Sequence, residues 1–283
     1  MGCTVWHWGR RREHYGRRWP VRRRECRRLR EHGKRRGQGA GVLGQFWGIG
    51  VGPGPRGLMP VAAVEVLARA DVIYLPRARS ADLSIARQCL EGIAIAEARL
   101  REVEFTMDPD RDVLREHYSA LADEIAVELE AGKNVAYLTL GDSMTYSTYG
   151  YTLAALKDRL PSLPAKTFPG VTSFAAAAAA MEWPLGEGKE RVLILPCPDD
   201  AQALREDIES HDVVVLMKIG KRLPMVLQVL RDMGISTHCA LAARIGLPGE
   251  TLRGDVGTLP DDAALGYLST MLIRRTERKK RHA

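Results

Sequence analysis

The sequence predicts an α/β protein of two domains, each built around a mostly parallel sheet, with an active-site cleft between the domains. The first observation is that short apolar runs alternate with longer segments of helical periodicity along most of the chain, as in βαβ units. The second is a Pro-rich segment, residues 161–164, that divides this alternation into two halves. The third is length, because 283 residues accommodate two domains of about 100–150 residues each.

The predicted strands are short apolar runs bounded by glycine, proline or polar residues. Residues 135–140 are the clearest case, since Gly132 stops the helix before them and Gly141 follows them. Pro76 is expected to end the second strand, because proline cannot donate to a ladder. We expect strands at residues 45–50, 71–76, 102–106, 135–140, 165–168, 192–195, 212–218, 237–242 and 267–273.

The predicted helices carry apolar residues three and four positions apart. In the longest of them, residues 111–131, the side chains of Leu114, Leu121 and Ile125 lie at helical spacing. Because the helices separate consecutive strands, they are expected to act as crossovers between parallel strands. We expect helices at residues 58–70, 81–90, 111–131, 146–160, 172–181, 201–210 and 223–233.

The positive charge of the chain is concentrated at its N-terminal end. Residues 1–40 contain 14 Lys and Arg against 3 Asp and Glu, a net charge of +11, whereas the other residues carry 28 against 32, or −4. Residues 1–41 are therefore predicted to be a disordered basic leader, followed by an N-terminal domain at 42–161, a C-terminal domain at 162–274 and a basic tail at 275–283. An alternative is an RNA-binding arm, since arginines with interspersed tryptophans can contact phosphates and stack on bases.

Cysteine and histidine usage limits the class of protein. The five cysteines are scattered without a CxxC pair, which argues against a disulfide framework or a zinc ribbon and predicts a cytoplasmic location. The seven histidines form no spaced cluster, and neither a GxSxG nor an HExxH motif occurs. No apolar run is long enough for a membrane helix, so neither a membrane partner nor a protein metal site is expected.

Three loops after predicted strands contain the residues most able to bind a ligand, because free backbone groups and helix N-termini meet at that edge of an α/β sheet. The first loop, residues 48–57 (GIGVGPGPRG), has closely spaced glycines that let the backbone approach a ligand. The second, residues 138–149 (LTLGDSMTYSTY), places Asp142 and several hydroxyl groups after a strand. The third, residues 168–175 (FPGVTSFA), places Thr172 and Ser173 at the start of an Ala-rich helix.

Each loop also has a purely structural interpretation. The first could be a tight strand-to-helix turn, and its spacing fits neither the dinucleotide fingerprint nor a P-loop. Asp142 could cap the helix that contains Tyr146, and the third loop could begin a well-capped buried helix. For each loop taken singly, both interpretations stay open.

Together the three loops resemble those of the tetrapyrrole methylase family, which transfers methyl groups from S-adenosylmethionine to corrin precursors and sirohaem. The resemblance covers roughly residues 44–275 and includes VVLMK at 214–218 and ALAARIGLPGE at 240–250. The LGD-x-x-x-YSTYGY form is similar to the branch that methylates C-20 of precorrin-2 or cobalt-factor II. The resemblance implies a homodimer with the cofactor folded into a cleft between two α/β domains.

The resemblance also implies a set of cofactor-binding residues. Two departures concern neighbouring positions, since Ser143 stands where the family usually has proline and Thr106 replaces the proline of a Phe-Pro-Met segment. The first departure predicts a less rigid turn, and the second puts the substrate role of that segment in question. The expected cofactor ligands are Pro53, Leu140, Gly141, Asp142, Met144, Thr145, Thr172, Ser173, Met217 and Ala240.

The implied reaction is a direct attack of a meso carbon of the macrocycle on the activated methyl group, for which the protein supplies positioning. Asp142, Tyr146 and Tyr149 are the candidates for a base that removes the proton from the methylated carbon. A polycarboxylate substrate requires local cations, and cobalt, if present, would arrive inside that substrate. The expected substrate-binding residues are Gly52, Arg56, Arg77, Lys218 and Arg222.

Two alternatives to C-20 methylation stay open from the sequence. The first is another tetrapyrrole methylase, acting on uroporphyrinogen III or at another corrin position. The second belongs to a different class, a nucleic-acid-binding protein that uses the Arg-rich arm, although a disordered leader is the favoured interpretation of that segment.

Overall fold

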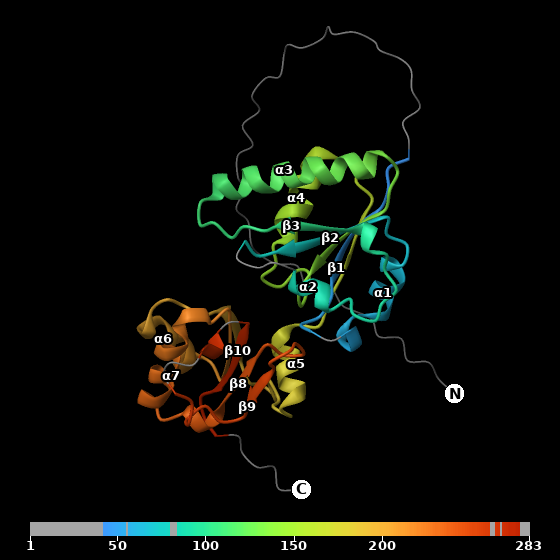
Figure 1. Cartoon of the computed structure of the whole chain (residues 1–283). Coiled ribbons are helices and arrows are strands. Elements are labelled where there is room, and N and C mark those ends of the chain that lie inside the picture. The colour runs from blue at the N-terminus through green and yellow to red at the C-terminus, as the bar shows by residue number, and fades with distance from the viewer. Residues whose placement is uncertain (1–41, 55, 80–83, 261–263, 267, 278–283) are drawn as a thin grey trace, which may run out of the picture. The chain divides into compact units, whose positions relative to one another are not determined.

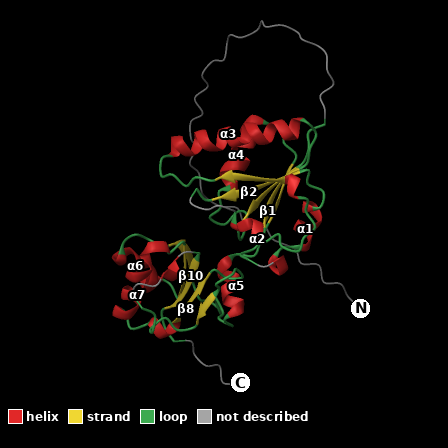
Figure 2. Ribbon diagram, in the orientation of Figure 1, coloured by secondary structure: helices red, strands yellow, loops and turns green. Residues whose placement is uncertain are grey.

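The computed structural model describes residues 42–54, 56–79, 84–260, 264–266 and 268–277 (Figure 1). The predicted leader at 1–41 and most of the predicted tail lie outside the described residues. The described residues form two five-stranded sheets with helices on both faces (Figure 2), which confirms the predicted α/β class.

The first sheet is wholly parallel, with the order β3-β2-β4-β1-β5. Its central strands β1 and β4 are buried at every residue, because helices cover both faces. α3 and α4 pack on one face and α1 and α2 on the other, so alternate strand residues enter two different cores. The strands are β1 (Phe46–Gly50), β2 (Val72–Arg77), β3 (Leu100–Glu104), β4 (Val135–Thr139) and β5 (Ala165–Phe168), and the helices are α1 (Val61–Leu67), α2 (Ile85–Gln88), α3 (Arg111–Glu130) and α4 (Tyr149–Arg159).

The second sheet is mixed, with the order β6-β7-β10-β8-β9. Only β6 and β7 pair in parallel, since β10 returns antiparallel between β7 and β8, and β9 pairs antiparallel with β8, so the prediction of a mostly parallel sheet is wrong for this half. α6 and α7 cover one face, while α5 covers the other. The elements are α5 (Ser173–Ala180), β6 (Val192–Pro196), α6 (Ala201–Ser210), β7 (Val213–Met217), α7 (Leu223–Asp232), β8 (Cys239–Ala243), β9 (Thr251–Arg253) and β10 (Ser269–Arg274). Short 3-10 helices lie at Arg56–Leu58, Glu97–Arg99, Gly220–Arg222, Ser236–His238 and Ala264–Gly266.

Several predicted boundaries differ from the structure. β5, which was expected to be the first strand of the second domain, pairs with β1 and belongs to the first sheet. The strands of the second sheet therefore all come after Phe168. The domain boundary at 161/162 stays a prediction. The first turn predicted for α4 is a loop, and the helix begins at Tyr149. α2 is much shorter than expected, with residues 81–83 outside the described part, and β9 was not predicted.

Pro76 does not end β2, because its missing N–H is not needed at this position. The carbonyl of Arg77 accepts from the amide of Phe105 on the β3 side, so Pro76 faces the opposite side. On that side the pairing with β4 ends at Tyr74, and the carbonyl of Pro76 accepts instead from the Ser84 hydroxyl at 2.6 Å. The proline therefore breaks no ladder.

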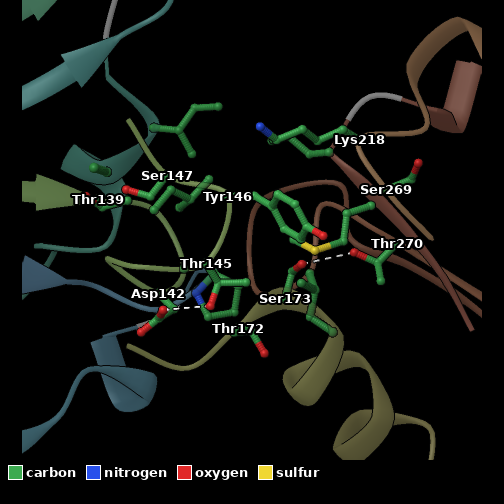
Figure 3. Close-up of a pocket in the computed structure, with 18 of the residues that line it drawn as sticks. Thr139, Asp142, Thr145, Tyr146, Ser147, Thr172, Ser173, Lys218, Ser269 and Thr270 are labelled. Carbon is green, nitrogen blue, oxygen red and sulfur yellow. Dashed lines mark hydrogen bonds between the residues drawn. The ribbon is translucent and has the colours of Figure 1, made fainter. Parts of the chain in front are cut away.

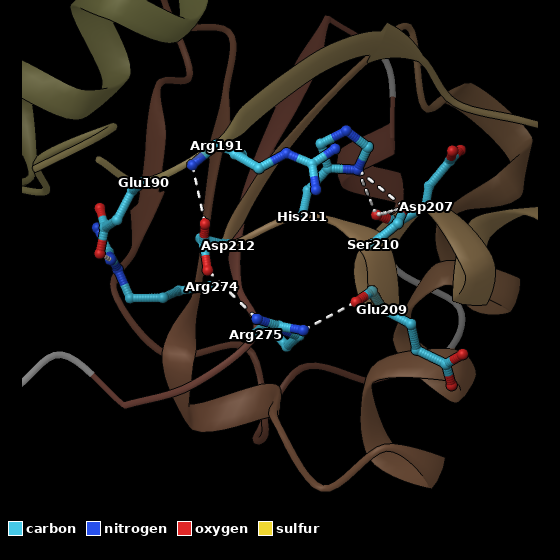
Figure 4. Close-up of polar contacts among 9 residues, drawn as sticks. All are labelled: Glu190, Arg191, Asp207, Glu209, Ser210, His211, Asp212, Arg274 and Arg275. Atoms are coloured by element: carbon cyan, nitrogen blue, oxygen red, sulfur yellow. Dashed lines mark hydrogen bonds and ion pairs between the residues drawn. The ribbon is translucent and has the colours of Figure 1, made fainter. Parts of the chain in front are cut away.

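A buried arginine at the end of β10 ties this strand to the segment between α5 and β6, where its counter-ion Glu190 lies (Figure 4). The Arg274 side chain is 6% exposed, and its Nη1 donates to Glu190 Oε1 at 2.5 Å. Its Nη2 donates to the carbonyl of Pro184, and the guanidinium lies 5.1 Å from the ring centroid of Trp183. Next to it, Asp212 accepts from the amide of Arg191 and from the side chain of Arg275.

Removing the carboxylate from this buried ion pair is expected to destabilise the fold. Glu190→Gln would leave the Arg274 charge without a counter-ion, and we expect the free energy of unfolding to fall by about 2 kcal/mol. Glu130→Gln is the matched control, because its ion pair with Arg159 has both side chains 44% exposed and is worth well under about 1 kcal/mol. Equal losses for the two variants in urea denaturation would contradict the assignment.

Candidate functional site

The main feature of the described residues is a cavity of about 480 Å³ at the carboxyl ends of strands from both sheets. It is lined by residues that follow β2, β4, β7 and β8 and by the start of β10. Such an edge collects free backbone groups and loop side chains, which is why α/β proteins bind ligands there. The walls are mainly apolar, with hydroxyl groups at intervals.

Most of the predicted site residues line this cavity (Figure 3). They come from all three loops identified in the sequence and from the end of β7. These residues are Pro53, Leu140, Gly141, Asp142, Thr145, Tyr146, Thr172, Ser173, Met217 and Lys218.

Three predicted residues near the cofactor loops lie outside the lining. Met144 points to solvent with 64% of its surface exposed. Ala240 is fully buried in the middle of β8 and packs in the core under α5. Tyr149 is fully buried as well, and its hydroxyl bonds to the Thr167 hydroxyl at 2.7 Å, so its position does not support the predicted role as a base.

The predicted substrate-binding residues separate in the same way. Arg77 pairs with Glu102, and Arg222 pairs with Asp199, so both cations already face carboxylates away from the lining. Gly52 contributes backbone hydrogen bonds to Gly141 and does not line the cavity. The side chain of Arg56 lies outside the described part of the chain.

The structure also brings in residues that sequence reasoning missed. Arg244, Ile245 and Leu247 line the cavity from the loop after β8, inside the ALAARIGLPGE segment. Phe105 and Met107 line it from the loop after β3, the segment that Thr106 had placed in question. Both loops follow the carboxyl ends of strands, but these strands belong to different sheets, and the sequence alone did not indicate that the two loops line one cavity.

Backbone contacts at glycine hold the first three loops together. A Cβ on Gly170 would lie 2.1 Å from the Gly141 carbonyl oxygen and 2.7 Å from the Gly50 carbonyl carbon. Gly52 and Gly141 form an isolated antiparallel bridge, with hydrogen bonds of 3.1 and 2.7 Å. These close approaches explain why each loop carries glycine at the crossing point.

A second close approach links the first loop to the loop after β8. A Cβ on Gly54 would lie 2.5 Å from the carbonyl carbon of Gly246. This contact brings the residues after β1 against the residues after β8, and both segments contribute to the cavity lining.

Asp142 joins the second and third loops through its carboxylate. Its Oδ2 accepts from the Gly170 amide at 2.9 Å, and its Oδ1 accepts from the Met144 amide and the Thr145 hydroxyl at 3.0 and 2.8 Å. Partial burial acts to raise the pKa of Asp142, but these hydrogen bonds outweigh it and hold the pKa below its ordinary value. The carboxylate is thus a fixed anion whose two oxygens are engaged.

The predicted cap role of Asp142 is wrong, because α4 begins later at Tyr149 and the hydroxyl of Ser147 accepts from that residue's amide. Ser143, expected to loosen the turn, is instead fully buried, and its hydroxyl donates to the carbonyl of Phe168 at 2.9 Å. A proline at this position could not make that bond. Ser143 therefore adds a second tie between the β4 and β5 loops.

Tyr146 crosses from the second loop toward the second sheet. Its backbone is left-handed, with φ of 50°, and its hydroxyl donates to the carbonyl of Ile194 in β6 at 2.9 Å. Thr172 caps α5 by accepting from the amide of Ala175, and Ser173 bonds to Thr270 at the start of β10 (Figure 3). The buried hydroxyl of Thr139 lines the cavity without a hydrogen-bond partner among the described residues.

Within the described ranges, no group of three or more His, Cys, Asp or Glu side chains is arranged to hold a metal ion. The three described cysteines, Cys89, Cys197 and Cys239, are buried free thiols. Among the helices of the described residues, none combines the length and the apolar character that a membrane crossing requires.

Comparison with known proteins gives the class to which this fold and cavity belong. The model of the tetrapyrrole (corrin/porphyrin) methylases matches residues 45–260, which contain all the residues that line the cavity except Gly266, Leu268, Ser269 and Thr270. The chain is a member of the tetrapyrrole methylase family, as the resemblance of its loops predicted.

Individual relatives agree with this assignment. The chain is 29% identical to the cobalt-precorrin-2 C(20)-methyltransferase of Salmonella typhimurium, over 82% of this chain and 97% of the relative. It is 30% identical to the precorrin-2 C(20)-methyltransferase of Sinorhizobium sp, over 83% and 96%. A solved cobalt precorrin-4 methyltransferase shares the fold, with a TM-score of 0.62 and 20% identity over 81% of this chain and 94% of that one.

Proposed function

We propose that this protein transfers a methyl group from S-adenosylmethionine to C-20 of precorrin-2 or of its cobalt-containing counterpart, in cobalamin biosynthesis. The observation that carries the proposal is the extent of the similarity to two C(20)-methyltransferases, which spans 97% and 96% of their lengths. The aligned region includes the three loops that cross at Gly50, Gly141 and Gly170 beside the cavity.

The cavity fits the methyl donor on structural grounds. Polar backbone and hydroxyl groups lie at intervals along the mainly apolar lining, as in sites that orient a small ligand. The Leu140–Asp142 backbone and Thr145 offer polar groups for an amino-acid moiety, and the hydroxyl residues Thr172 and Ser173 belong to the same lining. Met217 and Ile245 supply apolar surface on which a flat purine can pack.

When bound, S-adenosylmethionine supplies a methyl group already activated by its sulfonium, so the protein need not provide a covalent nucleophile. The chain's part is to hold the two reactants in line and to exclude water, which can supply several kcal/mol of the barrier, up to about 7–11 in ideal cases. Tyr146 lines the cavity and its hydroxyl oxygen retains acceptor capacity after donating to Ile194. We assign to Tyr146 a positioning role, in which its hydroxyl oxygen accepts a hydrogen bond from the substrate near the methylated carbon while the proton of that carbon leaves to water, whereas Asp142 orients the loops.

We further propose that the protein is a cytoplasmic homodimer. The scattered cysteines favour a reducing compartment. Large apolar side chains at Met144 and Tyr151 are 64% and 51% exposed, and a second copy would give them a partner. Sedimentation at micromolar concentration tests the dimer.

Anaerobic turnover of metal-free precorrin-2 beside cobalt-factor II, with a ¹³C-methyl donor, tests the function. We expect methylation at C-20 of at least one of them, assigned by mass and NMR, and the faster substrate decides whether cobalt is carried. Uroporphyrinogen III serves as the control for a sister activity. Failure to methylate either corrin precursor would overturn the proposal.

The arginine-rich arm lies outside the described residues, and a nucleic-acid-binding function is tested by deleting residues 1–41. We expect methyl transfer to survive the deletion. Tight RNA binding that is steeply salt-dependent and lost on deletion would favour the other class.

A further inference from the structure

Two cations line the cavity, and neither has a carboxylate partner in the part of the chain that the structure describes. They are Lys218, after β7, and Arg244, after β8. The acid in the same lining, Asp142, is occupied by Gly170, Met144 and Thr145 and does not pair with them. By contrast, Arg77 and Arg222, outside the lining, each face a carboxylate.

Among the described residues, the Lys218 ammonium has a single hydrogen-bond contact, a 3.8 Å approach to the thioether sulfur of Met107 on the loop after β3. A sulfur atom is a weak acceptor and cannot neutralise a charge. The surrounding protein partly desolvates the Lys218 ammonium and lowers its pKa, although the residue remains exposed to solvent. An anionic ligand in the cavity would provide the counter-ion that the described residues do not provide to Lys218.

The Arg244 guanidinium is also available to bind an anionic ligand. Its Nε donates to the carbonyl of Pro248 at 2.8 Å, which fixes the plane of the guanidinium. The two terminal nitrogens have no hydrogen-bond or ion-pair partner among the described residues, so their fork of donors remains available. Such a fork matches the geometry of a carboxylate.

Both cations are held in an unfavourable backbone conformation. Five non-glycine residues in the described ranges have positive φ, and four of them line the cavity, namely Tyr146, Lys218, Arg244 and Leu268. For Lys218 and Arg244 the φ angles are 55° and 52°. Left-handed residues other than glycine cost free energy and concentrate where a side chain must be aimed at a functional site.

The sheet sets the distance between the two cations. β7 and β8 both run antiparallel to β10, which lies between them, so they end at the same edge. Met217 pairs with Thr270 and Ala243 pairs with Ser269, which places the next residues, Lys218 and Arg244, two strand spacings apart. Their backbones are therefore about 10 Å from each other. At this separation each side chain can reach a different carboxylate of a wide macrocycle.

We propose that Lys218 and Arg244 form a two-point grip on two carboxylate side chains of the tetrapyrrole, and that this grip fixes which meso carbon faces the methyl donor. The proposal rests on the proposed function for the identity of the substrate. Lys218 and Arg244 would then act as residues that determine the position of methylation.

Direct binding tests the grip without turnover. Uroporphyrin is titrated into the full chain without the methyl donor, and binding is followed by quenching of porphyrin fluorescence. We expect Lys218→Met and Arg244→Gln each to weaken binding about tenfold or more, because each removes a charge-assisted bond. The matched variants Lys157→Met and Arg253→Gln, at exposed positions outside the lining, should bind like the wild type. Unchanged binding by both grip variants would overturn the proposal.

Two further variants separate lost charge from lost structure. Lys218→Arg should retain most of the binding, whereas Lys218→Gly should lose it while its melting temperature stays equal or rises, since glycine accepts the left-handed backbone. If Lys218→Gly binds uroporphyrin as well as the wild type, the lysine charge is not part of a grip and the proposal is wrong.

The position of methylation is the decisive readout. In the Lys218→Met/Arg244→Gln double variant we expect a higher KM and a share of ¹³C-methyl at a position other than the wild-type one. Product of unchanged position at undiminished kcat/KM would refute the orienting role. If instead the wild type methylates no tetrapyrrole while uroporphyrin binding still depends on both cations, the proposed function fails and the grip stands.

Discussion

Gly170→Ala is expected to destabilise the protein by about 3 kcal/mol or more and to abolish most of its activity. The new Cβ would lie 2.1 Å from the carbonyl oxygen of Gly141 and 2.8 Å from the Cα of Gly50. Both neighbours are backbone atoms, so no side chain can rotate away, and the loops after β1, β4 and β5 would have to separate. That separation would also lengthen the bond from the Gly170 amide to Asp142.

Gly150→Ala is the matched control for this prediction. Gly150 lies in α4, and nothing stands within 4 Å of the position its Cβ would take. Alanine is favoured over glycine inside a helix by about 1 kcal/mol, so this variant should be neutral or more stable. Guanidinium denaturation and methyl-transfer rates would check both variants. A Gly170→Ala protein that resembles the wild type would show that the loops are not in contact in solution.

Asp142→Asn is expected to lower turnover about tenfold to a hundredfold and to destabilise the fold by about 1–3 kcal/mol. Every group facing the carboxylate donates a hydrogen bond, namely the amides of Gly170 and Met144 and the Thr145 hydroxyl. An asparagine must turn its NH₂ toward one of the two amides, which leaves two donors facing each other. The loop that lines the cavity would then shift.

The same measurement distinguishes a fixed anion from a catalytic base. If Asp142 orients the loops, activity and stability fall together, whereas a base would lose activity with stability intact. Asp158→Asn, at an exposed position of α4, is the control. Urea denaturation alongside initial rates gives both quantities.

The pH dependence of stability follows from the lowered pKa of Asp142. A carboxyl group whose pKa is lower in the folded than in the unfolded state stabilises the fold above the unfolded value of about 3.9. This contribution is lost as the pH falls through the folded value. The difference in unfolding free energy between wild type and Asp142→Asn should therefore be constant near neutrality and shrink below about pH 4. A difference that grows on acidification would contradict the hydrogen-bonded carboxylate.

The features that the sequence places where the structure has them are those set by local pattern. Buried parallel strands appear in the sequence as short apolar runs, and the helices appear as apolar residues three and four positions apart. The α/β class and most element positions were therefore predictable. The loops were predictable because glycines and hydroxyls cluster where strands end. Tyr149, Ala240 and Met144 were misplaced, because whether a residue next to a loop faces the cavity, the core or solvent depends on where the helix begins and how the strand is oriented.

The Gly141-Asp142 turn has a position that the sequence predicts and hydrogen-bond partners that it does not. Its position after β4 followed from the sequence, but its partners did not, since the Gly170 amide and the Phe168 carbonyl come from a strand that pairs with β1. Ser143 looked like a weakness of the turn and is a buried anchor, because its hydroxyl meets an acceptor that chain order does not reveal.

The sequence by itself determined the family, the alternation of strands and helices and the loops that carry chemistry, because these depend on short-range pattern and residue type. The tertiary structure alone decided that β10 returns between β7 and β8 and so places Lys218 and Arg244 at one edge, where neither pairs with a carboxylate of the described residues. Strand order and the positions of distant charges depend on packing between segments that are far apart in the sequence, and a short-range pattern does not contain that information.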